Sequence, residues 1–324
     1  MKCSARIYIN PCRQMGVVHL TSYFRCNNWG FQRDSIPLAA GGEYESWTQS
    51  FKAAPRYSAA VIAEERIMIC LGVDIGSVAA KAVVWEASGE KVLARAVIPT
   101  GWDHRQAIED VCAMALSEAG VSPKDVAASA LTGYGRVAGK DKMRAVSEIA
   151  CHAKGAHFLV PEAGGVIDIG GQDSKAILLG AGGAVVDFAM NDKCAAGTGR
   201  FVSMAATLLG QDLQGFADLA ATGSPLPINS MCAVFAESEI VGLLAKRNSP
   251  ADVAAGICHS IARRTAGLAS RLNLQKNPCV FSGGLAGNTT IAAGLGEYLH
   301  QTVVAAPFPQ FVGALGAAIL ASLR

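Results

Sequence analysis

Two cysteine-containing stretches carry the most specific chemical signal in this chain. They read NDKCAAGTGRF at 191–201 and NSMCAVFAESEIVGLLAK at 229–246, and their cysteines are Cys194 and Cys232. In each stretch the cysteine stands where a helical pattern begins. A thiolate at a helix N-terminus is favoured by the helix dipole and by unpaired backbone N–H groups. Two such sites in one chain could hold an anionic centre with sulfur ligands, although a free cysteine is often simply a small buried residue.

An apolar face follows each cysteine. The apolar positions are Phe201, Met204, Ala205 and Leu208 after the first cysteine, and Val234, Ile240, Val241 and Leu244 after the second. Recurrence at three to four residues is typical of a helix that buries one face. We therefore expect a helix packed on the core behind each cysteine. Glu237 and Glu239 fall in the first turns of the second helix, where negative charge suits the dipole.

A turn motif occurs twice. The string GVDIGS at 72–77, followed by Lys81, is echoed by VIDIGG at 166–171, followed by Lys175. In both copies an apolar strand ends in Asp-Ile-Gly and a second strand follows, and the two aspartates are 94 residues apart (168 − 74). An internal repeat of this length predicts two similar domains that face each other.

The residue types in these turns suit a polyphosphate. Glycine at the tip lets backbone N–H groups approach phosphate oxygens, and an aspartate at the strand end can hold Mg²⁺ through water. We predict Asp74 and Asp168 as catalytic residues, and Gln172 and Asp173, which follow the second turn, as candidates to orient an attacking water. The predicted nucleotide-binding residues are Gly76, Ser77, Lys81, Gly170, Gly171, Gly283 and Gly284.

The last two of these glycines belong to a third small-residue segment. An apolar strand at 279–281 leads into SGGLAGN at 282–288, and a helical pattern follows. Without bulky side chains, such a loop lets an adenosine ring lie against the backbone. The chain then ends with GALGAA at 313–318, whose glycines three apart allow a helix to pack closely against another backbone.

These segments together predict an α/β protein with two duplicated domains and a polyphosphate-binding cleft between them. Strands are expected at 69–74, 80–86, 91–98, 126–132, 166–168, 175–179 and 279–281, and helices at 104–119 and around 147–157. The expected boundaries are 68–165 for the first domain and 166–305 for the second, which carries both cysteine stretches. Residues 306–324 are expected to form a C-terminal helix that packs back on the first domain.

Composition narrows the class of protein. The chain has 324 residues, of which 51% are hydrophobic and 17% charged, so it can bury a large core. A net charge of +2 offers no electrostatic case for nucleic acid. The longest apolar run, 312–323, is too short for a membrane span, and no secretory signal is recognisable. We therefore expect a cytoplasmic protein with no membrane partner.

The remaining cysteines give no local metal motif. Ten cysteines in a chain of this length are not a disulfide scaffold, and no C-x-x-C occurs. We expect them to be mostly reduced, and we interpret Cys70, Cys112 and Cys151 as core residues. A single-chain cluster held by Cys194, Cys232, Cys258 and Cys279 is an alternative that the spacing leaves open.

Residues 1–67 do not match the rest of the sequence. They contain Cys3, Cys12 and Cys26 with scattered proline and glycine, and no periodicity that could bury a core. We interpret them as a leader that is poorly ordered, or that lies upstream of a natural start at Met68. An accessory or targeting segment is the alternative.

The motifs resemble a known family. The two Asp-Ile-Gly turns, the Ser-Gly-Gly loop and the closing GALGAA helix resemble the sugar kinase/Hsp70/actin (ASKHA) ATPase superfamily. Within it, NDKCAAGTGRF and CAVFAESE are similar to the activator components of 2-hydroxyacyl-CoA dehydratases and to the related ATPase subunits of benzoyl-CoA reductases. TGYGR, SEIACHAKGA and DIGGQDSK also resemble that family. The resemblance covers residues 68–324.

This resemblance implies a cofactor and partners. It implies a homodimer with one [4Fe–4S] cluster at its two-fold axis, to which each subunit contributes Cys194 and Cys232. ATP binding and hydrolysis, with Mg²⁺, would drive one electron into a dehydratase or reductase component that has its own iron–sulfur cluster. A ferredoxin or flavodoxin would supply the electrons. Four thiolates from two chains agree with a two-fold axis.

Two other functions fit the same fold. A small-molecule kinase would need a carboxylate base and an acceptor pocket, and it would carry no iron. A nucleotide-binding sensor would not turn ATP over. Tyr134 and Arg136, in TGYGR, are either interdomain or partner contacts or plain loop residues, and His152 is interpreted as structural.

Overall fold

The computed structural model describes residues 6–7, 22–23, 67–139, 141–230, 232–272, 274 and 277–323. The chain divides into two compact units, 1–62 and 63–324. In the first unit only β1 (Arg6–Ile7) and β2 (Ser22–Tyr23) are described, and they pair antiparallel. Most of the predicted leader, 1–67, therefore lies outside the described residues.

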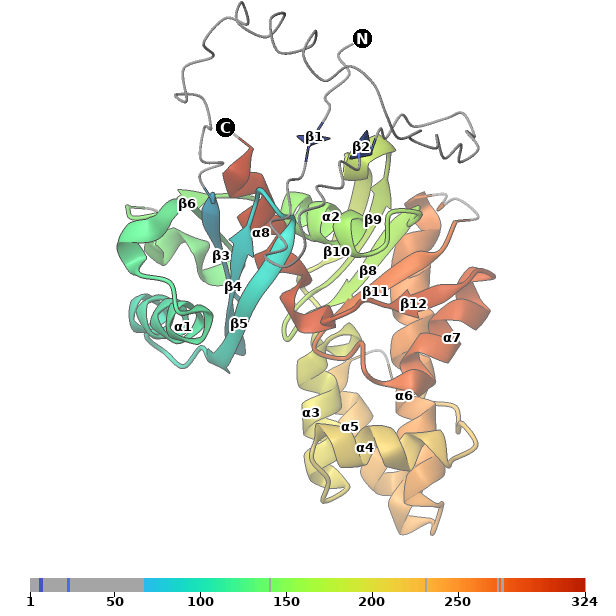
Figure 1. Ribbon diagram of the computed structural model, residues 1–324. Coiled ribbons are helices and arrows are strands. Elements are labelled where there is room, and N and C mark those ends of the chain that lie inside the picture. Colours follow the sequence, from blue (N-terminus) through green and yellow to red (C-terminus); the bar gives the residue numbers. More distant parts are fainter. Residues whose placement is uncertain are drawn as a thin grey trace, which may run out of the picture. The chain divides into compact units, whose positions relative to one another are not determined.

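Two five-stranded sheets form the frame of the second unit (Figure 1). The strands of the first sheet are β3 (Ile69–Ile75), β4 (Ala79–Glu86), β5 (Lys91–Pro99), β6 (Val126–Thr132) and β7 (Arg144–Ala145). Those of the second are β8 (Gly165–Ile169), β9 (Ser174–Leu179), β10 (Val185–Asn191), β11 (Cys279–Gly283) and β12 (Val303–Ala305).

The two sheets have the same topology. The first runs β5-β4-β3-β6-β7 and the second β10-β9-β8-β11-β12. In each, the first three strands along the chain form an antiparallel meander, and the fourth pairs parallel with the first. We call each sheet with the helices that pack on its outer face a lobe. The duplicated α/β architecture predicted from the Asp-Ile-Gly repeat is therefore confirmed.

Eight α-helices join and cover the sheets in the described part of the second unit. They are α1 (His104–Ala119), α2 (Glu148–Leu159), α3 (Gly199–Leu208), α4 (Leu213–Ala221), α5 (Ala233–Ala245), α6 (Pro250–Ala269), α7 (Thr289–Leu299) and α8 (Val312–Ser322). The 3-10 helices are η2 (Pro123–Asp125), η3 (Tyr134–Gly139), η4 (Ala181–Gly183), η5 (Ala195–Gly197), η6 (Ser270–Leu272) and η7 (Pro309–Phe311).

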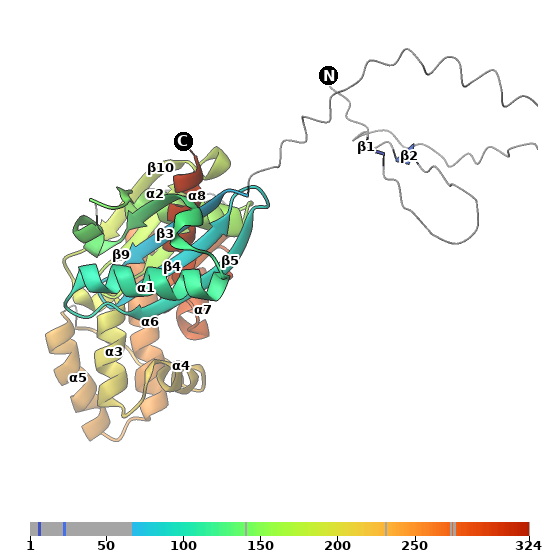
Figure 2. The same cartoon turned by 60° about the vertical axis from the view of Figure 1, so that its left-hand side comes forward.

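The helices form layers on both faces of each sheet. Helix α1 covers the outer face of the first sheet (Figure 2), and α6 and α7 pack against the outer face of the second. Helices α2 and α8 lie between the two sheets and share apolar cores with both. In particular α8 packs on β3 and β6, together with Cys70 and Trp85.

Strand alternation decides which residues face this middle layer. On β3, Leu71 and Val73 belong to the core under α1, whereas Cys70 faces α8. Side chains an even number of residues apart on a strand share a face, so Asp74 points to the same side as Cys70. On β8, Val166 packs in the core with α2, so Asp168 also points toward the middle layer. The two aspartates therefore approach α2 from opposite sides.

Helices α2 and α8 cross at a very short distance. A Cβ placed on Gly316 would lie 1.8 Å from the backbone oxygen of Cys151, so no side chain fits at this position. A Cβ placed on Gly155, in the same crossing, would lie 2.1 Å from the backbone oxygen of Val312. This backbone-to-backbone packing explains why glycine recurs in the GALGAA segment.

Most of the predicted elements match the structure. Strand β6 has the predicted bounds, and α1 begins and ends where expected, with Asp103 as its N-cap. The predicted helix at 147–157 is α2, for which Ser147 is the N-cap.

The apolar face expected after Cys232 is partly wrong. Helix α5 buries Ala236 and Ile240, while Val234 and Val241 are exposed along with Phe235. The four-residue spacing from Ala236 to Ile240 defines the buried stripe of this helix, and Val234 and Val241 lie off it.

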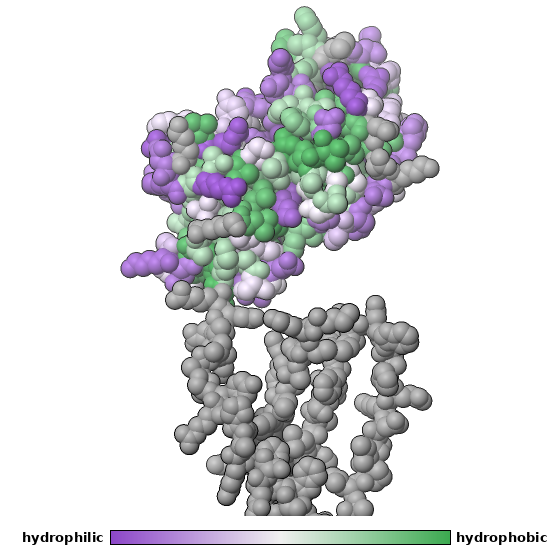
Figure 3. Space-filling view, turned by 90° about the horizontal axis from the view of Figure 1, so that it is seen from above, coloured by the Kyte–Doolittle hydropathy of each residue, from purple (hydrophilic) through white to green (hydrophobic). Residues whose placement is uncertain are grey.

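No helix in the described part of the chain is long and apolar enough to cross a bilayer. Figure 3 shows one face of the molecule, on which hydrophobic patches alternate with hydrophilic side chains.

Candidate functional site

The residues predicted to bind the nucleotide and to act on it lie together in a cleft between the two lobes. It holds a cavity of about 230 Å³. The structure places ten of the twelve predicted site residues on its wall, and the two cysteines lie elsewhere. The ten are Asp74, Gly76, Ser77, Lys81, Asp168, Gly170, Gly171, Gln172, Gly283 and Gly284.

The two Asp-Ile-Gly turns face each other across this cleft. A Cβ on Gly171 would lie 2.5 Å from Cγ2 of Val78 and 2.9 Å from Oγ of Ser77. The turn of the second lobe thus touches the turn of the first. An extended polyphosphate between them would meet backbone N–H groups from both sides.

Each turn is backed by a cross-strand ion pair. Asp74 is the register partner of Lys81 across β3 and β4, with 3.3 Å between Oδ2 and Nζ. Asp168 is the register partner of Lys175 across β8 and β9, at 3.5 Å. The lysines follow their aspartates by the same number of residues in both lobes, so the repeat extends to the chemistry of the site.

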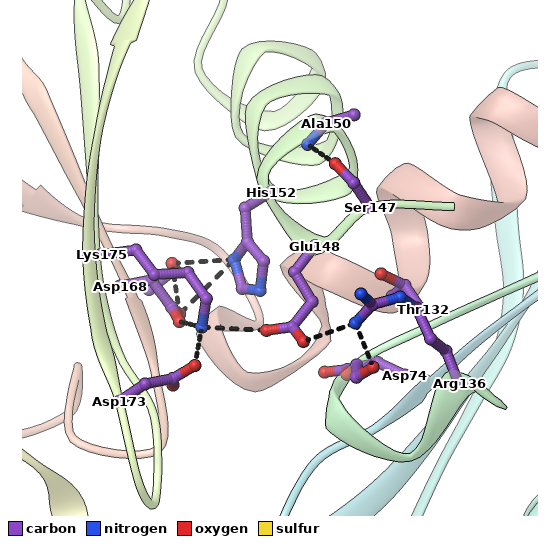
Figure 4. A network of polar contacts seen from close by, with 12 residues as sticks. Asp74, Thr132, Arg136, Ser147, Glu148, Ala150, His152, Asp168, Asp173 and Lys175 are labelled. Carbon is purple, nitrogen blue, oxygen red and sulfur yellow. Dashed lines mark hydrogen bonds and ion pairs between the residues drawn. The ribbon is translucent and has the colours of Figure 1, made fainter. Parts of the chain in front are cut away.

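The two ion pairs have different surroundings. The side chain of Lys81 is 17% exposed, and Asp74 is its one ion-pair partner in the described residues. Lys175 is 3% exposed and also contacts Glu148 at 3.0 Å and Asp173 at 2.8 Å (Figure 4). Because Asp173 binds Lys175, the structure gives this carboxylate a partner other than an attacking water.

Asp168 is the most enclosed acid of the cleft. Ser282 donates a hydrogen bond to its Oδ1 at 2.9 Å, and Nδ1 of His152 lies 3.4 Å from the same oxygen. Burial alone would raise the pKa of Asp168, but His152, Lys175 and Ser282 outweigh it and hold the pKa below its usual range. Burial would likewise lower the pKa of Lys175, and its three carboxylates raise that pKa instead. Both groups are therefore charged at neutral pH.

His152 lies between the two aspartates at the floor of the cleft. It comes from α2 and is buried. A Cβ on Gly313 would lie 2.9 Å from its Nε2 and 3.3 Å from Oδ2 of Asp74, so the ring and Asp74 flank one glycine of α8. Together with its contact to Asp168, this position is consistent with the structural role expected for His152.

Sequence reasoning missed Glu148. Its Oε1 lies 3.4 Å from Nη1 of Arg136 on η3, and its Oε2 contacts Lys175 on β9. The one local signal was SEIACH, in which Ser147 caps α2 and Glu148 stands in its first turn. A helix cap alone does not reveal contacts with both lobes.

The two predicted metal ligands lie on the second lobe, away from this cavity. Cys194 and Cys232 are exposed thiols, whereas the other five cysteines of the described region are buried. Cys232 is the N-cap of α5 as predicted. Cys194 instead precedes the short η5, and α3 begins only at Gly199, so its expected place directly at a long helix is corrected. The extended residue Thr198 separates η5 from α3.

Neighbouring side chains fix the loop that carries Cys194. The amide nitrogen of Asn191 donates to the backbone oxygen of Cys194 at 2.9 Å, and the Cys194 N–H donates back to the Asn191 carbonyl oxygen at 3.1 Å. This reciprocal pair closes the turn between β10 and η5, so the loop is tied to a strand end.

The loop before Cys232 is held by two charged groups. The carboxylate of Glu239 accepts hydrogen bonds from the backbone N–H groups of Asn229 and Ser230 at 2.9 and 2.8 Å. Arg264, on α6, donates to the backbone oxygen of Ser230. Burial lowers the pKa of Arg264, and its electrostatic interaction with Cys194 opposes this shift.

The two exposed thiols are a donor set of the kind that iron–sulfur clusters use. Two exposed thiols, one of which interacts with the guanidinium of Arg264, suit an anionic cluster. No group of three or more histidine, cysteine, aspartate or glutamate side chains in the described region could hold a metal ion. The single-chain set of Cys194, Cys232, Cys258 and Cys279 is therefore wrong, and Cys258 and Cys279 are instead buried in the core.

Comparisons with known proteins agree with this geometry. An activator of lactoyl-CoA dehydratase from Anaerotignum propionicum is 42% identical over 256 residues, which cover 78% of this chain and 97% of that protein. The crystal structure of the Acidaminococcus fermentans (R)-2-hydroxyglutaryl-CoA dehydratase component A matches with a TM-score of 0.75 and 38% identity, over 78% of this chain and 97% of that one.

A second solved structure has a nucleotide analogue bound. It is the activator of the 2-hydroxyisocaproyl-CoA dehydratase from Clostridium difficile with bound ADPNP, which matches with a TM-score of 0.73 and 36% identity, over 78% of this chain and 94% of that one. The model of the BadF/BadG/BcrA/BcrD ATPase family matches residues 71–321. The resemblance inferred from the motifs is confirmed: the chain belongs to the BadF/BadG/BcrA/BcrD ATPase family.

Proposed function

We propose that this protein is an ATP-dependent activator that delivers single electrons to a 2-hydroxyacyl-CoA dehydratase. Its relatives named as activators are matched over nearly their whole length. The nucleotide is ATP, as the family implies, and Mg²⁺ would sit between its phosphates and the carboxylates of the cleft.

In this proposal the cleft residues act by position and charge. Asp74 and Asp168 approach from opposite lobes and would hold the hydrated Mg²⁺, while Lys81 reaches the phosphates. The glycines of the two turns offer N–H groups, and Gly283 and Gly284 let the adenosine lie against the backbone. Gln172 remains the residue proposed to orient the attacking water.

Cys194 and Cys232 would be the ligands of the cluster. A bound [4Fe–4S] cluster supplies one-electron redox chemistry at low potential. Each chain contributes two thiolates, so a second copy must complete the set around a two-fold axis. The exposed Val234, Phe235 and Val241 follow Cys232 on α5 and give this second copy an apolar surface to cover.

One observation carries the proposal. The backbone oxygens of Gly170 and Gly171, in the second phosphate turn, accept hydrogen bonds from Gly199 and Arg200 at 2.8 and 3.0 Å. Gly199 begins the helix that follows the Cys194 loop. A shift of the turn on nucleotide binding therefore displaces the start of α3 and the cysteine loop before it. This is a direct mechanical link between the two proposed sites.

The electron acceptor is proposed to be a dehydratase component with its own iron–sulfur cluster, and the donor a ferredoxin or flavodoxin. A benzoyl-CoA reductase-type partner is the second candidate. It is favoured by 30% identity to one of the benzoyl-CoA reductase polypeptides of Thauera aromatica, over 79% of this chain and 94% of that protein.

Iron analysis of anaerobically purified protein tests the proposal. We expect about four iron atoms per dimer in the wild type and their loss in Cys194→Ser and Cys232→Ser. Cys258→Ala is the matched control, since its buried thiol packs in the core, and it should keep the iron. Electron paramagnetic resonance of the reduced protein should show the cluster signal in the control and not in the two serine variants.

Two results would overturn it. Iron-free protein whose ATP turnover requires a sugar or acid acceptor would indicate a kinase. Retention of a full cluster in Cys194→Ser would remove that ligand from the assignment.

A further inference from the structure

We infer that Glu148 is a positioning residue that fixes the two phosphate turns relative to each other, an inference that rests on the proposed ATPase site. Glu148 is the first residue of α2, the helix between the two sheets. One carboxylate oxygen faces a cation of the first lobe, Arg136, and the other faces a cation of the second lobe, Lys175 (Figure 4).

The contact with Lys175 reaches the second turn. The same ammonium binds Asp173 inside the turn and Asp168 at its base. Lys175 is buried, and three carboxylates share its one charge. Without the Glu148 charge, the Lys175 ammonium would interact only with Asp168 and Asp173. It could then move toward these two carboxylates and away from α2.

The contact with Arg136 reaches the first turn. Nη1 of Arg136 also donates to the backbone oxygen of Gly133 at 3.0 Å. Gly133 lies against Asp74, because a Cβ placed there would be 2.5 Å from Oδ1 of Asp74. A continuous set of contacts therefore joins the two aspartates across the lobes. It runs through Asp74, Gly133, Arg136, Glu148, Lys175 and Asp168.

A helix-dipole role alone would not explain this geometry. An acidic residue in the first turn stabilises a helix whatever lies beside it. Glu148 differs because its two oxygens are divided between cations from different sheets, and because its side chain, 18% exposed, lines the cleft. Its carboxylate therefore sets how far the lobes stand apart when phosphates occupy the turns.

The test compares Glu148→Gln with Glu162→Gln, which removes one exposed carboxylate outside the cleft. We expect Glu148→Gln to lower kcat for ATP hydrolysis on the order of 10- to 100-fold, because small misplacements of reacting groups are costly. ADP affinity should change less than about threefold, since ADP lacks the phosphate that both turns must hold. If Glu148 holds the two turns together, a non-hydrolysable ATP analogue should close the lobes in Glu162→Gln but not in Glu148→Gln, and small-angle scattering measures this closure.

A double-variant cycle separates positioning from a general loss of structure. Arg136→Gln removes the first-lobe contact and leaves Lys175 with all three carboxylates, so this variant is expected to fold. If Glu148 acts through Arg136, the Arg136→Gln/Glu148→Gln pair should be no slower than Glu148→Gln alone. Independent, multiplying effects would overturn the inference, and so would a Glu148→Gln enzyme as active as Glu162→Gln.

These outcomes are independent of the iron analysis. ATP hydrolysis and closure are measured without a dehydratase partner, so an iron-free protein would contradict the proposed function while leaving the Glu148 result readable. A normal cluster with unchanged closure in Glu148→Gln would contradict this inference alone.

Discussion

Lys175 and Asp168 face each other across β8 and β9 just as Lys81 and Asp74 do across β3 and β4, yet only Lys175 is shared among three carboxylates. The same residue pair thus occurs in both lobes with two different environments. One lysine is enclosed in an ion network, and the other borders the cleft with a single ion-pair partner among the described residues.

This difference predicts that the same substitution mainly affects stability at Lys175 and mainly affects ATP binding at Lys81. Lys175→Met would leave a cluster of carboxylates without its cation and should lower the free energy of unfolding by about 3 kcal/mol or more. Lys81→Met should cost about 1 kcal/mol and weaken ATP binding roughly tenfold, through the loss of a charged phosphate contact. Urea unfolding and calorimetric titration measure the two quantities. Equal stability losses would contradict the asymmetry.

The pKa of Asp168 predicts a stability change in acid. Because its folded-state pKa is held below the unfolded value, its contribution is full above the unfolded pKa of about 3.9 and is lost as the pH falls through the folded pKa. The urea concentration at the unfolding midpoint of the wild type should therefore decrease as the pH is lowered below about 4. Asp168→Asn should be less stable at pH 7, and its midpoint should fall less over the same range. If the urea midpoint fell equally steeply with decreasing pH in the wild type and in Asp168→Asn, Asp168 would not be the group responsible.

Cysteine burial predicts selective alkylation. Burial raises the pKa of Cys112, Cys151 and Cys258 to about 12, which leaves about one part in 10⁴ as thiolate at pH 8. Brief iodoacetamide treatment of iron-free protein, mapped by mass spectrometry, should label Cys194 and Cys232 well before these three. If the folded protein were labelled equally fast at the exposed and the buried cysteines, Cys194 and Cys232 would not differ from the others in reactivity.

Gly316 predicts a steric penalty at the α2–α8 crossing. Gly316→Ala would push a methyl group into the backbone of Cys151 and should destabilise the protein by about 3 kcal/mol, measured by urea unfolding. Gly267→Ala is the matched control, because this exposed glycine of α6 has no atom within 4 Å of the added carbon. The control should be neutral or more stable by up to about 1 kcal/mol.

Arg264 predicts an electrostatic effect on the proposed cluster. Arg264→Gln removes a cation whose guanidinium contacts Ser230 and interacts with the Cys194 sulfur. The reduced cluster carries more negative charge, so its reduction potential should become more negative in this variant. Arg263→Gln removes an exposed neighbouring charge and should shift the potential less. Redox titration followed by electron paramagnetic resonance measures both, and a larger shift in Arg263→Gln would contradict the assignment.

Local sequence patterns determined much of this protein. The Asp-Ile-Gly repeat predicted the duplicated sheets because the chemistry of a strand end and a tight turn is contained in a few adjacent residues. The same locality made Ser147 recognisable as a helix cap and NDKCAAGTGRF as a family motif.

Contacts between distant segments were decided only by the tertiary structure. Glu148 is 27 residues from Lys175 and 12 from Arg136 (175 − 148 and 148 − 136), and no spacing rule joins groups from two sheets through a helix between them. The exposure of Val234 and Val241 on α5 likewise depended on which stripe met α6, because helical periodicity shows that a face exists but not which neighbour will cover it. Charge sharing at Lys175 and the cation beside Cys194 arose in the same way, since electrostatic environment is set by what folding brings near a group.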